Sequence, residues 1–125
     1  MGRALIASLL AAAVVAPAAP AAPAALPFKV SVQFSKRSPK AGARWEYAVL
    51  VTDRDGVRIP ATVYPQVFVR GEVFDTLGAH YTLLGIVDQP YTWSKRLRGR
   101  SGVVFRLTVY AAASQVVLKY AVRVR

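Results

Sequence analysis

Residues 44–52 read RWEYAVLVT, and this run decides the fold class. One set of alternate positions collects large apolar side chains, namely Trp45, Tyr47, Val49 and Val51. Successive side chains of a β-strand point to opposite faces, so such a run covers a core with one face and meets water with the other. Aromatic and β-branched residues are also typical of half-buried strands. The run therefore predicts a strand that places Trp45 in a core.

The same period of two returns in residues 28–35, 103–110 and 115–125. In these runs Phe105 and Leu118 fall on the predicted core face. Turn residues separate the runs, and after residue 28 we find no convincing helical stripe. The pattern predicts an all-β domain over residues 28–125, an immunoglobulin-like antiparallel β-sandwich of about seven strands.

Residues 61–94 are the least regular part of this domain. Ala61–Arg70 is predicted as a strand, but Pro65 lacks the amide donor of a sheet ladder and indicates an edge or a bulge. Further short strands are predicted at Val73–Phe74, His80–Val87 and Tyr91–Ser94.

Residues 1–27 are predicted to be a signal peptide and an Ala/Pro-rich segment. Arg3 gives a positive start, and Ala4–Val15 is an uncharged stretch too short for a bilayer-spanning helix and of ordinary length for a secretory signal helix. Prolines at positions 17, 20 and 23 then end that helix. We expect a protein that is secreted or lies in the cell envelope, with no membrane span after cleavage. An uncleaved signal anchor is the alternative.

The run Pro39–Gly56 resembles the second strand of small secreted bacterial Ig-like domains, including the YtkA-like kind: a Pro-x-x-Gly turn, a long aromatic and valine strand, and a polar glycine turn. Pro90–Trp93 and the two closing strands are similar to them too. The resemblance implies a bacterial Ig-like sandwich without a catalytic signature. Some members of this kind handle copper through His and Met, whereas here only His80 and the initiator Met1 are present.

The inventory of reactive residues argues against an enzyme. The chain has no Cys and one His, so thiolate chemistry, cysteine zinc sites and disulfides are excluded. No serine lies in a Gly-x-Ser-x-Gly elbow, and the acidic residues are scattered. We therefore predict no catalytic residues, no metal ligands and no cofactor.

Two short features have ordinary structural interpretations. Asp53-x-Asp55-Gly56 imitates the start of a calcium loop, but position twelve of such a loop would be Tyr64, so a hairpin-type turn is favoured. His80 alone is a poor metal site, because structural zinc takes four protein ligands.

The surface feature that indicates a function is positive charge. The chain holds 17 Lys and Arg against 6 Asp and Glu, a formal net charge of +11. Four cations fall within Lys95–Arg100, and two further groups are Lys36, Arg37 and Lys40, and Arg123 with Arg125. Trp93 precedes the first group and is interpreted either as a core residue or as an exposed platform. The predicted binding residues are Trp93, Lys95, Arg96, Arg98 and Arg100.

These observations predict a secreted, non-enzymatic Ig-like binding or accessory module of the bacterial envelope. Its expected partner is an anionic envelope polymer or an acidic protein, met through the basic loop, and not a specific nucleic acid. The alternatives are a structural envelope domain without a dedicated ligand, whose cations only maintain solubility, and a copper-handling periplasmic domain. Convergence of the three cationic groups around Trp93 would favour the binding interpretation, and their dispersal would disfavour it.

Overall fold

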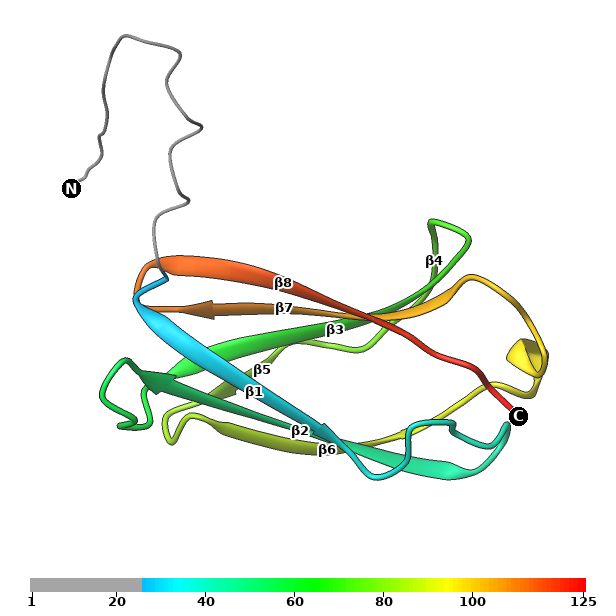
Figure 1. The fold of residues 1–125 in the computed structure, drawn as a ribbon, viewed down its shortest axis with the longest axis horizontal. Coiled ribbons are helices and arrows are strands. Elements are labelled where there is room, and N and C mark those ends of the chain that lie inside the picture. Colours follow the sequence, from blue (N-terminus) through cyan, green and yellow to red (C-terminus); the bar gives the residue numbers. More distant parts are fainter. Residues whose placement is uncertain (1–25) are drawn as a thin grey trace, which may run out of the picture.

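The computed structural model describes residues 26–125, drawn in colour in Figure 1. The predicted signal peptide lies outside the described residues, except for Leu26 and Pro27. Within the described range, no helix is long and apolar enough to cross a membrane.

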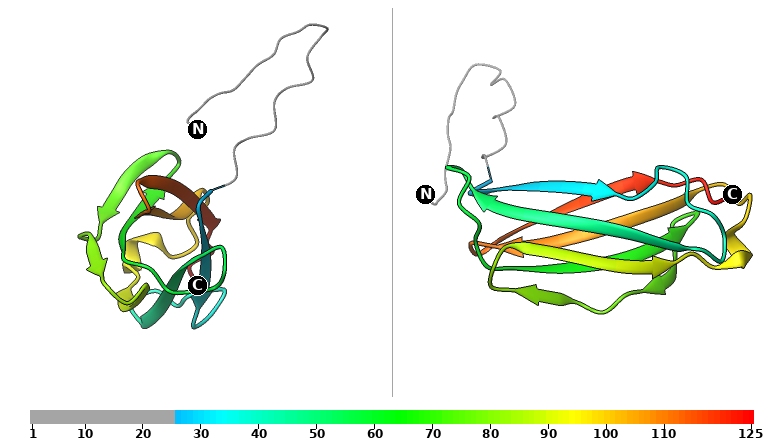
Figure 2. Two further views of the ribbon diagram at one scale, coloured as in Figure 1. Left: turned by 90° about the vertical axis from the view of Figure 1, so that its left-hand side faces the viewer. Right: turned by 90° about the horizontal axis from the view of Figure 1, so that it is seen from below.

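Within residues 26–125, eight strands form two antiparallel sheets. The first sheet has the order β1-β2-β6, with bounds β1 (Phe28–Phe34), β2 (Arg44–Asp53) and β6 (Ile86–Thr92). The second has the order β4-β3-β7-β8, with bounds β3 (Ala61–Val69), β4 (Glu72–Thr76), β7 (Val103–Ala111) and β8 (Ser114–Ala121). The short β5 (His80–Thr82) also pairs with β3. The two sheets face each other across one interior (Figures 1 and 2), so the all-β prediction is confirmed.

An aromatic cluster fills the interior toward one end of the sheets. Phe105 on β7 lies 5.3 Å from Trp45 and 5.2 Å from Tyr47 between ring centroids, and all three side chains are buried. Phe34 stacks on Trp45 at 4.9 Å. Edge-to-face and offset contacts of this kind add to the free energy gained from the buried area. The predicted core positions of Trp45 and Phe105 are confirmed, and Leu118 packs against the same core.

Pro65 lies within β3, which has neighbours on both sides. Its carbonyl accepts a hydrogen bond from the Leu77 amide at 3.0 Å, on the side away from β7. The N and the carbonyl of one strand residue point to the same side, so the missing proline donor faces the gap between β4 and β5. The ladder to β7 stays continuous from Thr62 to Val69. The prediction that Pro65 lies at a sheet edge therefore holds only at this gap, where β3 has no paired neighbour. The predicted bulge is present in β3 but lies at Val67/Phe68 and not at Pro65.

The segment after β2 is the predicted tight turn. The Asp53 carboxylate accepts hydrogen bonds from the amides of Asp55 and Val57, both at 2.9 Å, and Gly56 has φ +87°. Asp53 thus stabilises its own turn, as aspartate commonly does.

Tyr47 provides a first testable prediction. Its hydroxyl is buried and has no hydrogen-bond partner within residues 26–125. An unsatisfied buried polar group costs about 1–3 kcal/mol, so Tyr47→Phe is expected to raise the free energy of unfolding by about 1 kcal/mol in urea denaturation at neutral pH. The exposed Tyr110 provides the matched control, because Tyr110→Phe should change little. A destabilised Tyr47→Phe protein would contradict this assignment.

The same residue gives a pH dependence. Burial raises the pKa of Tyr47 from its ordinary value of 10.0 to about 12. Between these values the unfolded chain releases the phenol proton more readily than the folded protein does. The contribution of Tyr47 to the free energy of unfolding is therefore fully present below pH 10 and falls as the pH rises toward 12. Denaturation curves at rising pH should therefore decline less steeply for Tyr47→Phe than for the unsubstituted protein.

Candidate functional site

Three segments that are far apart in the sequence meet at the end of the domain where the C-terminus lies (Figure 1). Backbone hydrogen bonds join them: Ala41 N donates to Arg125 O at 2.7 Å, Arg125 N donates to Pro39 O at 2.9 Å, and Gly99 N donates to Val124 O at 2.9 Å. These segments are the loops 35–43 and 93–102 and the tail 122–125. Their exposed cations are here called the basic end: Lys36, Arg37, Lys40, Lys95, Arg96, Arg98, Arg100, Arg123 and Arg125.

Apolar side chains hold the basic end on the core. Trp93, Leu97 and Val124 are 0%, 0% and 1% exposed. The indole of Trp93 packs edge-to-face on Trp45, at 5.3 Å between centroids, and on Tyr91, at 5.0 Å. The interpretation of Trp93 as an exposed contact residue is therefore wrong, because its ring is enclosed by other aromatic side chains. Trp93 anchors the loop on the core.

The loop after Trp93 turns its cations outward. The Ser94 hydroxyl accepts a hydrogen bond from Arg96 N at 3.1 Å, and this cap begins the 3-10 turn η1 (Lys95–Leu97). Leu97 is the residue of this turn that points into the core. A 3-10 helix has three residues per turn, so only one of the three side chains faces the core. Because Leu97 takes that position, Lys95 and Arg96 point toward solvent. Lys95, Arg96, Arg98 and Arg100 are all exposed, as the sequence predicted.

Close packing joins the first two cationic loops. Gly42 has φ +77°, and its amide donates to Trp93 O at 2.7 Å. A Cβ placed on Gly42 would lie 2.7 Å from Cε of Lys95, so the aliphatic part of Lys95 lies directly on this glycine. The positive backbone angle favours glycine here, and the absence of a Cβ leaves room for the Lys95 side chain.

On its other side the loop leans on β4. The Arg96 guanidinium lies over the Phe74 ring, 5.8 Å from the centroid. The Tyr91 hydroxyl donates to Asp75 Oδ2 at 2.9 Å, which links β6 to β4 across the two sheets. Burial, followed by this hydrogen bond and the carboxylate charge, raises the pKa of Tyr91. The loop is thus fixed from two directions.

Arg70 is a further cation beside the basic end that sequence reasoning missed. Its amide donates to Gly102 O at 2.9 Å, and with Arg100 and Glu72 it lines a pocket of about 310 Å³. Only the pairing of distant loops brings it there, and no local motif signals that pairing.

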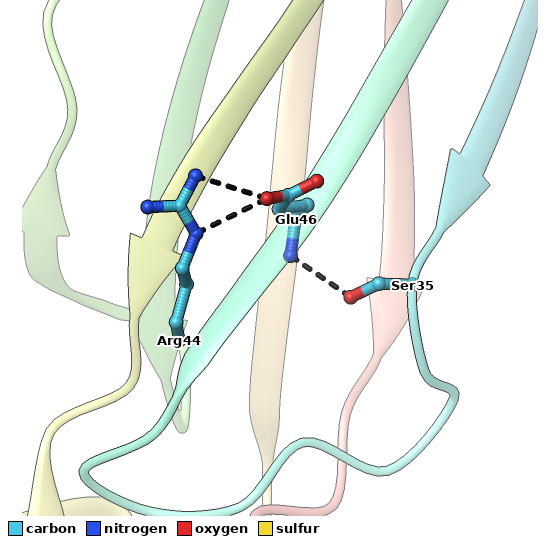
Figure 3. A network of polar contacts seen from close by, with 3 residues as sticks. All are labelled: Ser35, Arg44 and Glu46. Carbon is cyan, nitrogen blue, oxygen red and sulfur yellow. Dashed lines mark hydrogen bonds and ion pairs between the residues drawn. The ribbon is translucent and has the colours of Figure 1, made fainter.

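One ion pair is present among residues 26–125, and it joins Arg44 to Glu46 at 3.0 Å. Figure 3 shows this pair, with Glu46 N donating to the Ser35 hydroxyl at 2.9 Å. Both charged side chains are largely exposed, so the pair contributes less than about 1 kcal/mol. Within the described part of the chain, the basic end has no carboxylate partner, so its positive field is directed to solvent.

No group of three or more His, Cys, Asp or Glu side chains that suits a metal ion occurs within residues 26–125. His80, the residue weighed for copper, lies half-buried in β5.

Neither protein-family models nor curated proteins give a match to this chain.

Proposed function

We propose that the protein is a secreted, non-enzymatic, Ig-like binding module of the bacterial envelope. In this proposal the basic end binds an anionic envelope polymer or an acidic protein. The observation that supports this proposal most is the convergence of the three cationic segments into one surface, whose cations form no ion pair with a carboxylate within residues 26–125.

Strand order supports the immunoglobulin-like part of the proposal. An immunoglobulin constant domain places its strands A, B, E and D in one sheet and C, F and G in the other. Here β1-β2-β6 occupy the places of A, B and E, and β3-β7-β8 those of C, F and G; β4 lies beside β3, and within residues 26–125 no strand takes the place of D. The resemblance of Pro39–Gly56 to secreted bacterial Ig-like domains agrees with this order.

The form of the basic end favours an extended ligand over a small one. Its cations come from three segments and are exposed, so they offer many weak contacts over a surface. Arg96, Arg98 and Arg100 can each bind a phosphate or carboxylate through two parallel hydrogen bonds. A polymer carrying repeated phosphate or carboxylate groups matches this arrangement, because each added contact lowers the free energy of binding.

The proposal is tested by measuring the affinity of the purified protein for inorganic polyphosphate at several salt concentrations. Each neutralised phosphate releases a counterion, and for a single-stranded polyanion the slope of log K against log salt is about −0.7 per contact. We expect a slope of about −3 or steeper, which corresponds to four or more contacts. Absence of binding at about 0.05 M salt would contradict the proposal and favour a structural domain whose cations maintain solubility.

A further inference from the structure

The outer side of β8 is an unpartnered sheet edge within residues 26–125. At eight residues β8 is long for an edge strand, and its register with β7 shows no bulge. Among the other edges, β6 contains Pro90, β4 has five residues beside a bulge, and β1 is regular but one residue shorter than β8. Proteins usually block a long, regular edge because its free amides and carbonyls pair with other chains.

The register shows which backbone groups of β8 are free. Val122 N donates to Val103 O at 2.9 Å, so Val122 and every second residue before it face β7. The intervening residues therefore turn their amide and carbonyl groups outward along the edge. These residues are Gln115, Val117, Lys119 and Ala121.

A pocket of about 480 Å³ opens at the end of this edge, between β8 and the end of β1. Its apolar lining includes Phe34 and Tyr120, whose rings meet edge-to-face at 4.9 Å. Two exposed cations flank it, Arg37 of the basic end and Lys119 on the edge itself. Free backbone groups, an aromatic wall and positive charge thus occur together.

We infer that this edge binds an extended acidic peptide, which adds to β8 as a further strand over Val117–Ala121. Backbone hydrogen bonds to the free edge provide affinity in such complexes, and side-chain pockets provide specificity. An apolar side chain of the peptide rests on Phe34 and Tyr120, and its carboxylates meet Arg37 and Lys119.

Charge selects this occupant over a second copy of the chain. Two copies paired antiparallel over Val117–Ala121 would place Lys119 of one copy opposite Lys119 of the other. Like charges across a strand pair are destabilising, whereas an acidic strand pairs favourably with these cations. The inference builds on the proposed function, because Arg37 belongs to the basic end, and it names the partner as a peptide.

The test uses a capped eight-residue peptide of alternating Glu and Val, with polyphosphate as the non-peptide anion. Two derivatives carry backbone N-methyl groups, one on every Glu and the other on every Val. In an added strand only alternate amides face the edge, so one derivative should bind at least tenfold more weakly than the other. Equal affinities of the two derivatives would overturn the inference, and this comparison needs no change in the protein.

Matched protein variants separate the edge from the charge. Ala121→Pro removes an outward amide at the pocket and leaves every charge and every bond to β7 in place. It should weaken peptide binding at least tenfold and leave polyphosphate binding unchanged. Gln115→Pro makes the same change at the far end of β8 and should leave both affinities unchanged. If polyphosphate binds and the unmodified peptide does not, the inference is wrong and the proposed function stands. If neither binds, both are wrong.

Discussion

Replacing Trp93 by alanine is expected to lower the free energy of unfolding by about 3–5 kcal/mol, the usual cost of removing a large buried aromatic side chain. The indole is fully buried and contacts Trp45, Tyr91 and Phe105. The loss is large beside a total stability of about 5–15 kcal/mol for a typical domain. Urea denaturation followed by circular dichroism measures it.

Two further variants make the result specific. Tyr110→Ala removes an aromatic side chain that is 44% exposed on β7 and should cost far less. Trp93→Phe keeps a ring in place and removes an indole N–H that has no partner within residues 26–125, so it should retain most of the stability. A stable Trp93→Ala protein that binds polyphosphate less tightly would instead mean that the indole contacts ligand.

The second large effect concerns binding. Simultaneous replacement of Lys95, Arg96, Arg98 and Arg100 by glutamine is expected to lower polyphosphate affinity about 100- to 1,000-fold at low salt. A cation near an anionic surface contributes about 1 kcal/mol, and each 1.4 kcal/mol corresponds to a tenfold change in affinity. The salt slope should become shallower by about 3, since four contacts are lost. Titration at several salt concentrations measures both quantities.

Cations at the opposite end provide the control. Lys29, Arg54 and Arg58 lie at the start of β1 and around the turn that follows β2. Their combined replacement by glutamine lowers the net charge similarly but leaves the basic end intact, so it should change affinity much less per charge. Equal losses per charge in the two variants would show that affinity follows total charge and not the basic end.

The strands with strict alternation were predicted well from the sequence. The runs 28–35, 44–52 and 103–110 correspond closely to β1, β2 and β7, because one buried and one wet face impose a period of two. The last run was predicted too long. β8 ends at Ala121, Val122 makes one more hydrogen bond to β7, and residues 123–125 leave the sheet although Val124 stays buried. An extended tail docked on a core has the same alternation as a strand, so periodicity does not separate the two.

The candidate site was only partly predictable. The cations themselves are visible in the sequence, and their exposure follows from their charge. Their convergence depends on hydrogen bonds such as Ala41 N to Arg125 O, between residues far apart in the chain, which no local pattern encodes. Trp93 is an even number of residues after the buried Val87 of β6, so strand alternation predicts a buried side chain. The basic residues that follow Trp93 argued equally for an exposed one. The pocket beside β8 needs two strand edges side by side and has no sequence signal.

The gap beside Pro65 has an evolutionary consequence. Because the proline offers no donor there, the segment of residues 77–79 between β4 and β5 makes one backbone hydrogen bond to β3 within residues 26–125, from Leu77 N to the Pro65 carbonyl, and the Leu77 side chain packs against the core. Insertions or deletions at Gly78 and Ala79 would leave every ladder of both sheets untouched. Descendants of this chain are therefore expected to vary in length at this position before they vary elsewhere in the second sheet.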